Sequence, residues 1–183
     1  MKIAWPGFND QRTVILPFDR RCLVIPVNPI VLDGEPFEPK AEFHVTLIGK
    51  RVAGPLLERM AHDAAVEALL EQAFQAIDWS CEQTGPVHLL SRTRQRPDSS
   101  GRMSASIEKS IVLRLKMPGM AEFYGVLKSQ EVIDSSAPVP PPHITLYTCN
   151  YPRGIGVSSV EVLDELSGKI LSVNEFNEWC RKQ

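Results

Sequence analysis

The chain has 183 residues, of which 43% are hydrophobic, and its 20 Lys and Arg residues nearly balance its 22 Asp and Glu residues. This length and hydrophobic content predict a single domain, residues 1–183, with a substantial core. The balanced charge argues against a protein dedicated to duplex DNA, which needs many phosphate-neutralising cations. A small nucleotide or an RNA end remains as a ligand.

No stretch approaches the ~18 apolar residues of a membrane span, and the first residues lack the apolar core of a signal peptide. The four cysteines are scattered without a C-x-x-C pair, which favours reduced thiols over disulfides. They are Cys22, Cys81, Cys149 and Cys180. We therefore expect a cytoplasmic monomer with no membrane partner.

Short strands are predicted at the start of the chain. Residues 13–16 favour one strand, and the apolar run 22–27 favours another, with its proline at an edge or end. Residues 28–40 contain an Asp-Gly pair and several prolines, which predict a loop or wide turn.

Residues 43–47 read Phe-His-Val-Thr-Leu and predict a strand, in which side chains alternate between two faces. The odd-numbered residues are apolar and suit a buried face. The other face would carry His44, Thr46 and Ile48. This strand therefore presents an imidazole and a hydroxyl side by side.

Lys50 and Arg51 follow this strand. They either border a cleft or are solvated charges of a loop.

Residues 54–77 predict a helix with its proline in the first turn. Its apolar stripe has the spacing of a helix packed on a sheet. The stripe comprises Val66, Leu70, Ala73, Phe74 and Ile77. His62 is interpreted as a surface or structural histidine.

Strands are predicted at 79–83, 87–91 and 111–115, and a helix at 120–130. His88 is interpreted as a structural histidine of its strand. Residues 92–102 are polar and carry four arginines. They form either a mobile loop that reaches over a polyanionic substrate or a plain solvated hairpin tip.

A second His-x-Thr stretch follows a run of prolines that forces an extended approach. Here Ile144 and Leu146 share one face, and His143, Thr145 and Tyr147 share the other. Tyr147 would either bind phosphate or stack on a base, or serve as a packing residue at the strand end.

The stretch 149–156 predicts a glycine-containing loop without the G-x-x-x-x-G-K frame of a P-loop. Its Tyr151 and Arg153 are candidates for closing the site. Short helices are predicted at 157–167 and 174–182, around a final strand at 169–173. Trp5 is a further aromatic side chain of a kind that stacks on bases, but nothing in the sequence places it near the cleft.

The twin motifs, with histidines 99 residues apart, resemble those of the 2H phosphoesterase superfamily, defined by paired His-x-Thr motifs. The resemblance implies a mixed α+β (α/β) fold of two pseudo-symmetric lobes, with antiparallel sheets lining a central cleft and helices outside. It also implies chemistry without a metal or cofactor. One histidine would act as the acid and the other as the base, while Thr46 and Thr145 hold phosphate. Known members include 2′,3′-cyclic phosphodiesterases, 2′–5′ RNA ligase-type enzymes and viral enzymes that cut cyclic-nucleotide signals.

The residue types suit this chemistry. Imidazole titrates near pH 6.5, so one histidine can be neutral while the other is protonated, as acid–base cleavage of a phosphodiester requires. Each threonine hydroxyl can donate to a non-bridging phosphate oxygen. No HEXXH or G-x-S-x-G pattern favours a metal hydrolase or a serine nucleophile.

The sequence thus predicts a phosphoric diester hydrolase acting on a nucleoside or RNA 2′,3′-cyclic phosphate. Two alternatives stay open: a phosphodiesterase for 2′–5′ oligonucleotides or cyclic-nucleotide messengers, and an RNA- or nucleotide-binding module with weak or no activity. The structural alternative is a pair of half-buried strands that carry histidines by coincidence.

Overall fold

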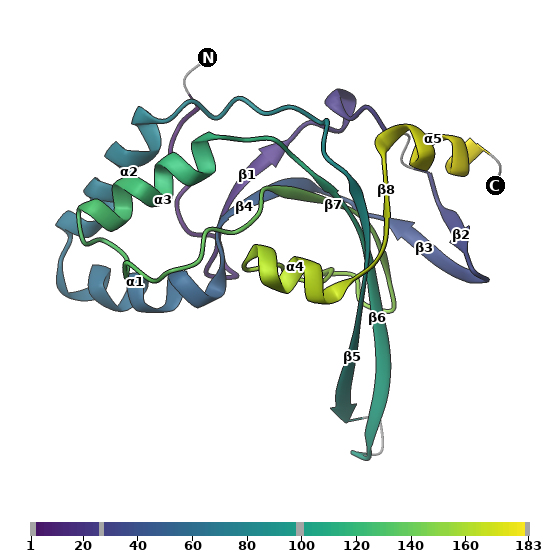
Figure 1. Cartoon of the computed structure of the whole chain (residues 1–183). Helices are drawn as coiled ribbons and strands as arrows, with labels where there is room; N and C mark the ends of the chain where they lie inside the picture. Colours follow the sequence, from purple (N-terminus) through teal and green to yellow (C-terminus); the bar gives the residue numbers. More distant parts are fainter. Residues whose placement is uncertain (1–2, 26–27, 98–100, 182–183) are drawn as a thin grey trace.

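The structure is a computed structural model that describes residues 3–25, 28–97 and 101–181. Within these ranges it is a mixed α+β protein with eight strands and five α-helices (Figure 1). The strands are β1 (Val14–Phe18), β2 (Ile30–Leu32), β3 (Glu35–Pro39), β4 (Phe43–Ile48), β5 (Val87–Pro97), β6 (Met103–Arg114), β7 (His143–Cys149) and β8 (Ser167–Leu171). The helices are α1 (Lys50–His62), α2 (Ala65–Ala76), α3 (Gly119–Ser129), α4 (Val160–Leu166) and α5 (Val173–Arg181), with a 3-10 turn at Arg20–Cys22.

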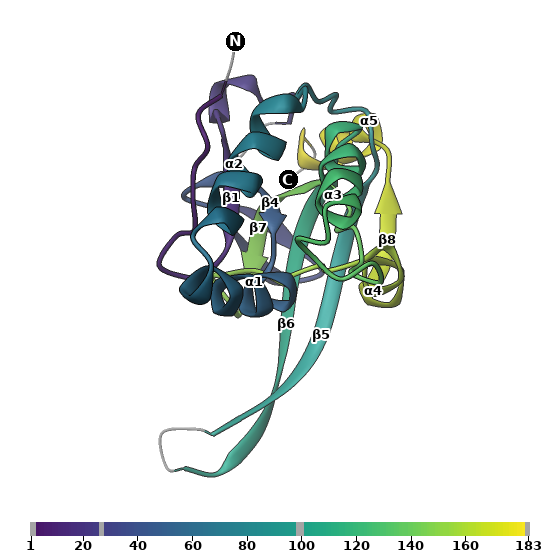
Figure 2. The ribbon, with the colours of Figure 1, turned by 90° about the vertical axis from the view of Figure 1, so that its left-hand side faces the viewer.

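The strands form two antiparallel sheets. β1 pairs with β4, and a six-stranded sheet runs in the order β2-β3-β7-β6-β5-β8 and curls into a half-barrel. The motif strands β4 and β7 belong to different sheets but contact each other. Helices α1, α2 and α3 lie together at one end of the molecule, and α5 lies near β8 (Figures 1 and 2). The two motifs therefore meet in the middle of the fold.

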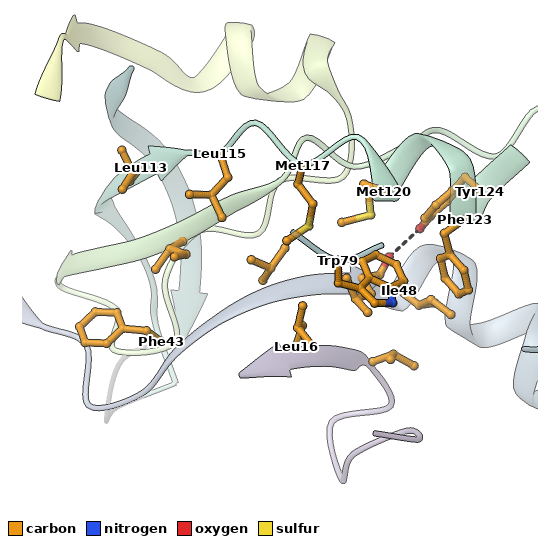
Figure 3. Close-up of a cluster of buried hydrophobic side chains, with 14 of the residues drawn as sticks. Leu16, Phe43, Ile48, Trp79, Leu113, Leu115, Met117, Met120, Phe123 and Tyr124 are labelled. Carbon is orange, nitrogen blue, oxygen red and sulfur yellow. Dashed lines mark hydrogen bonds between the residues drawn. The ribbon is translucent and has the colours of Figure 1, made fainter. Parts of the chain in front are cut away.

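The main core packs residues of both sheets against α2 and α3. Figure 3 shows part of this core, with labelled residues from β1, β4, β6 and α3. Trp79 stacks on Phe74 with ring centroids 5.0 Å apart and meets Phe123 edge-on at 5.4 Å. The buried Tyr124 hydroxyl donates a hydrogen bond to the Leu47 carbonyl over 3.0 Å. This bond ties α3 to the end of the first motif strand.

The helix expected over 54–77 is two helices. α1 begins at Lys50, directly after β4, so its proline lies in the helix interior and leaves the Arg51 carbonyl without its usual i+4 donor. α2 starts again after Asp63, whose carboxylate accepts the Ala65 N–H over 2.9 Å. The predicted apolar stripe from Val66 to Phe74 is buried as expected.

The loop expected over 28–40 is largely a β-hairpin. Asp33 and Gly34 have φ of 52° and 79° and join β2 to β3 as a two-residue turn. Both central residues of a type I′ turn need positive φ, which Asp-Gly supplies.

The prediction of a strand over 22–27 is wrong for the residues that the structure describes, because Leu23–Ile25 have no strand pairing. Pro26 and Val27 lie outside the described residues. The strand expected at 79–83 is reduced to one isolated bridge between Glu82 and Lys116.

The arginine-rich stretch 92–102 belongs mainly to a long hairpin. Residues 92–97 of β5 pair with residues 103–108 of β6, and we call this outer part the arm. The arm projects from the body of the molecule (Figures 1 and 2). Residues 98–100 at its tip lie outside the described residues.

No helix among the described residues has the length and apolar character to cross a membrane. All four cysteines are free thiols.

Candidate functional site

Both His-x-Thr pairs line one cavity of about 440 Å³. His44 and Thr46 enter it from β4, and His143 and Thr145 enter it from β7. Two imidazoles and two hydroxyls from opposite halves of the chain therefore face one volume large enough for a nucleotide-sized ligand.

Strand alternation explains why these side chains face the cavity. In β4, Phe43, Val45 and Leu47 are buried in the core, whereas His44 and Thr46 between them are partly exposed. In β7, Ile144 faces the core opposite Leu113, while Thr145 lies opposite Val112 on the other face of the sheet. Each strand thus buries aliphatic groups on one side and presents the His-x-Thr pair on the other.

Both motif strands shift register directly after the threonine. The partner of Thr46 is Ile15 and that of Ile48 is Val14, so Leu47 is an extra residue in β4. Leu146 is likewise an extra residue in β7, between the partners of Thr145 and Tyr147. An extra residue of this kind is a β-bulge, and it reverses the alternation for the residues that follow.

The bulges correct two expectations from simple alternation. Ile48 does not share the face of His44, because it is fully buried in the core. Tyr147 does not line the cavity: its ring is fully buried and lies 6.3 Å from that of Phe176 in α5. Burial raises the pKa of the Tyr147 hydroxyl. Of its two interpretations, the packing role is the one that the structure shows.

His143 is held in one tautomer by its surroundings. Its Nδ1 lies 2.8 Å from the Pro141 carbonyl, which can only accept, so Nδ1 carries the proton and donates it. Nε2 is then the nitrogen available for proton transfer. Burial lowers the pKa of His143, the bond to Pro141 partly opposes this, and the nearby Arg114 and His44 lower it further.

His44 is also biased toward its neutral form. Burial lowers its pKa, the Lys40 ammonium lowers it further, and the Glu42 carboxylate partly opposes both. Its Nδ1 is buried and has no hydrogen-bond partner among the described residues. Both imidazoles are therefore poised to accept a proton at neutral pH, and a bound anion would favour protonating one of them.

The cavity wall is cationic. Lys50, Arg51, Arg92, Arg94 and Arg153 line it, and the described lining residues include no Asp or Glu. The N-terminus of α1 also opens here, with no side-chain cap and no acidic residue in its first turn. Its positive end favours an anion. Of the two interpretations of Lys50 and Arg51, the structure places both at the cavity.

The loop after β7 closes one side of the cavity. Tyr151 and Arg153, both expected there, line it. Lys40 holds this loop by donating to the Pro152 carbonyl over 2.8 Å. The Ile155 N–H donates to the Ser110 hydroxyl of β6 over 3.0 Å.

Gly154 is a site residue that the sequence analysis missed. Its φ is +78°, and a Cβ placed there would lie 3.2 Å from the Thr145 side-chain methyl. Glycine therefore lets the loop lie directly against the second motif. The signal in the sequence was one glycine in a polar loop, which does not show what the loop packs against.

The remaining candidates lie elsewhere. Trp5 packs edge-on against Phe74 with ring centroids 5.3 Å apart and does not line the cavity. His62 is exposed at the end of α1. His88 is buried in β5 with Nδ1 2.9 Å from the Ser167 hydroxyl, as expected for a structural histidine.

Among the described residues, no group of three or more His, Cys, Asp or Glu side chains is arranged to hold a metal ion. Comparisons with protein-family models, with curated proteins and with solved structures find no match for this chain. The assignment of a function therefore depends on the chemistry of the cavity.

Proposed function

We propose that this protein is a phosphodiesterase that hydrolyses a nucleoside or RNA 2′,3′-cyclic phosphate by two-histidine acid–base catalysis, without a metal. The observation that carries the proposal is the convergence of His44, Thr46, His143 and Thr145 on one cavity with a cationic wall.

The reaction requires two simultaneous proton transfers. One neutral imidazole takes a proton from water as the water oxygen attacks phosphorus. The other imidazole, protonated, gives its proton to the ribose oxygen as the P–O bond of the ring breaks. The product is a phosphomonoester, and the two histidines have exchanged protonation states. Which histidine starts as the base depends on which ribose oxygen leaves.

The two threonines serve the phosphate itself. Negative charge grows on the non-bridging oxygens in the transition state, and hydroxyl donors fixed at those oxygens stabilise it. Thr46 and Thr145 are suited to this because a β-branched side chain on a strand has restricted χ1. The cations of the cavity wall and the α1 N-terminus add a favourable potential for the incoming anion.

Membership of the 2H phosphoesterase superfamily, with two pseudo-symmetric lobes, is part of this proposal. The paired motifs support it. So does the bulge directly after Thr46 and again after Thr145, because the two halves of the site then share one local construction.

The test is turnover in EDTA of 2′,3′-cyclic mononucleotides, an RNA ending in a cyclic phosphate, a 2′–5′ oligoadenylate and cyclic dinucleotides. We expect His44→Ala and His143→Ala each to lower kcat by about 10²–10⁴-fold, and Thr46→Val and Thr145→Val by about 10²-fold. His62→Ala is the matched control, since this histidine is exposed and lies outside the cavity.

The same panel separates the alternatives. Preference for the 2′–5′ or cyclic-dinucleotide substrates would move the assignment to those phosphodiesterases. Binding without turnover of any substrate would favour a nucleotide-binding module. Activity that disappears in EDTA and returns with a divalent cation would refute the metal-independent mechanism.

A further inference from the structure

A second hollow adjoins the cavity at the first catalytic candidate. It has a volume of about 380 Å³, and its lining residues include Ile15, Pro17, Arg20, Glu42 and His44. We call this hollow the shelf. His44 lines both the shelf and the cavity. The shelf is therefore an extension of the candidate site on the other side of this imidazole.

Strand register places the apolar part of the shelf directly beside the first motif. β1 lies alongside β4 (Figure 1), where Pro17 is the pairing partner of His44 and Ile15 is the partner of Thr46. Side chains directly opposite each other on antiparallel strands lie on one face, with Cβ atoms about 4.5–5.5 Å apart. Ile15 is half-buried and Pro17 is exposed. β1 therefore provides an accessible apolar surface next to the imidazole, on which the face of a flat ring can lie.

The charge of the site changes sign from one end of β4 to the other. After this strand, α1 begins, and Lys50 and Arg51 make the cavity wall cationic. Before the strand, Glu42 gives the shelf a carboxylate, whose charge acts on His44. Glu42 is exposed, and no salt bridge joins it to another described residue. A ligand with an anionic group and a separate set of hydrogen-bond donors is therefore oriented with the anion toward α1 and the donors toward Glu42.

We propose that the shelf is a nucleobase subsite that selects guanine, with the base lying on Ile15 and Pro17 and its Watson–Crick edge at Glu42. This inference rests on the proposed function and specifies the substrate of the same site. In a 2′,3′-cyclic nucleotide only the ribose separates the base from the phosphate, so the base has to lie close to the histidines. The shelf provides such a place, because it begins at His44.

The selection of guanine follows from the chemistry of a carboxylate, which can only accept hydrogen bonds when it is ionised. Guanine carries two neighbouring donors on its Watson–Crick edge, N1–H and the N2 amino group, and the two carboxylate oxygens can accept one bond from each. Adenine and cytosine present a single amino group beside a ring nitrogen that accepts, and uracil presents one N–H between two carbonyls. Those acceptors would face the Glu42 carboxylate and be repelled by it. Arg20, which also lines the shelf, carries a group that can donate to guanine O6.

The first test is the ratio of kcat/KM for guanosine 2′,3′-cyclic phosphate to kcat/KM for uridine 2′,3′-cyclic phosphate. We expect the wild type to favour guanosine about tenfold, the effect of one bidentate contact to a base, and Glu42→Gln to lose most of this preference. Glu42 also raises the pKa of His44, but that influence is common to both substrates and cancels in the ratio. Glu67→Gln is the matched control, because Glu67 is exposed on α2 and lines neither the cavity nor the shelf.

A second variant tests the apolar floor without changing the carboxylate. Ile15→Thr keeps a β-branched side chain on β1 but removes apolar contact area. It should raise KM for guanosine 2′,3′-cyclic phosphate about threefold and leave KM unchanged for methyl riboside 2′,3′-cyclic phosphate, which has no base. An equal rise in KM for both substrates would overturn the base-binding role of Ile15.

Binding measurements keep the subsite separate from catalysis. The probes are guanosine 3′-monophosphate and uridine 3′-monophosphate, titrated calorimetrically into the wild type and Glu42→Gln. The wild type should bind the guanosine ligand about tenfold more tightly, and Glu42→Gln should bind the two ligands almost equally. Equal binding of both ligands by the wild type, or a preference that survives in Glu42→Gln, would overturn the subsite. Guanine-selective binding that depends on Glu42, without turnover of any cyclic phosphate, would overturn the proposed catalysis alone.

Discussion

Gly154→Ala probes how closely the loop after β7 is fitted to the second motif. The glycine has φ of +78°, a left-handed conformation that costs an alanine about 1–2 kcal/mol. Its new Cβ would also lie 3.2 Å from the Thr145 methyl and 3.5 Å from the Ser110 hydroxyl oxygen. Thr145 is on a central strand and Ser110 binds the Ile155 N–H, so neither gives way without disturbing the site.

The expected magnitude follows from two opposing terms. The backbone strain of about 1–2 kcal/mol is reduced by about 0.4–1 kcal/mol, because alanine lowers the entropy of the unfolded chain. The tight contact with Thr145 adds to the cost. We expect a net loss of about 1 kcal/mol in the free energy of unfolding, or about 2–4 °C in Tm for a chain of this size.

The effect on catalysis should exceed the effect on stability. In the proposed mechanism the Thr145 hydroxyl binds phosphate, and displacing it by a fraction of an ångström should cost about tenfold in rate, since the reaction would depend on alignment. The assay is thermal unfolding together with kcat/KM on the best substrate. Gly156→Ala is the stability control, because this glycine is not left-handed and an added Cβ would meet no atom within 4 Å. Wild-type Tm and kcat/KM in Gly154→Ala would refute the reasoning.

Three further predictions test the site and its supports. The pKa values of His44 and His143 are lowered in the folded state, so the unfolded chain binds more protons as pH falls below about 6.5. The free energy of unfolding, measured in urea, should therefore drop from pH 7.5 to pH 5. It should drop less steeply in a His44→Gln, His143→Gln double variant. Lys40→Met removes a cation that lowers the pKa of His44. The limb of the kcat/KM–pH profile that belongs to His44 should therefore move to higher pH. An unmoved profile would contradict the electrostatic coupling between Lys40 and His44. Tyr124→Phe leaves the buried Leu47 carbonyl without its donor and should cost about 1–3 kcal/mol in urea unfolding; an unchanged midpoint would show that the bond contributes nothing.

The sequence was informative where side chains follow a simple period. Alternation placed His44 and Thr46 on one face of a strand, and the apolar stripe of α2 is buried as predicted. For the arginine-rich stretch 92–102 the sequence left open a mobile loop or a hairpin tip. The stretch has no alternating apolar residues, so no period marked the outer parts of β5 and β6, which the structure pairs. Asp33-Gly34 was a readable hairpin signal, and the surrounding prolines obscured it.

The site residues that were missed depend on tertiary structure. Gly154 matters because the loop lies against Thr145, which no local pattern shows. Tyr124 reaches the cavity from α3, a helix whose own sequence predicts only packing. A left-handed glycine and a buried hydroxyl are chosen by their neighbours, which are distant in the chain.

The error at Ile48 and Tyr147 has one cause and points to how the site is built. After each threonine come two large apolar residues, Leu47-Ile48 and Leu146-Tyr147, and a strictly alternating strand would send the second of each pair into the cavity. The extra residue in each strand returns both side chains to the core, where they are fully buried. Ile48 and Tyr147 therefore do not line the cavity, and each strand gains a second buried anchor directly behind its threonine. In this chain both halves of the site therefore combine a His-x-Thr pair, two consecutive large apolar residues and a bulge.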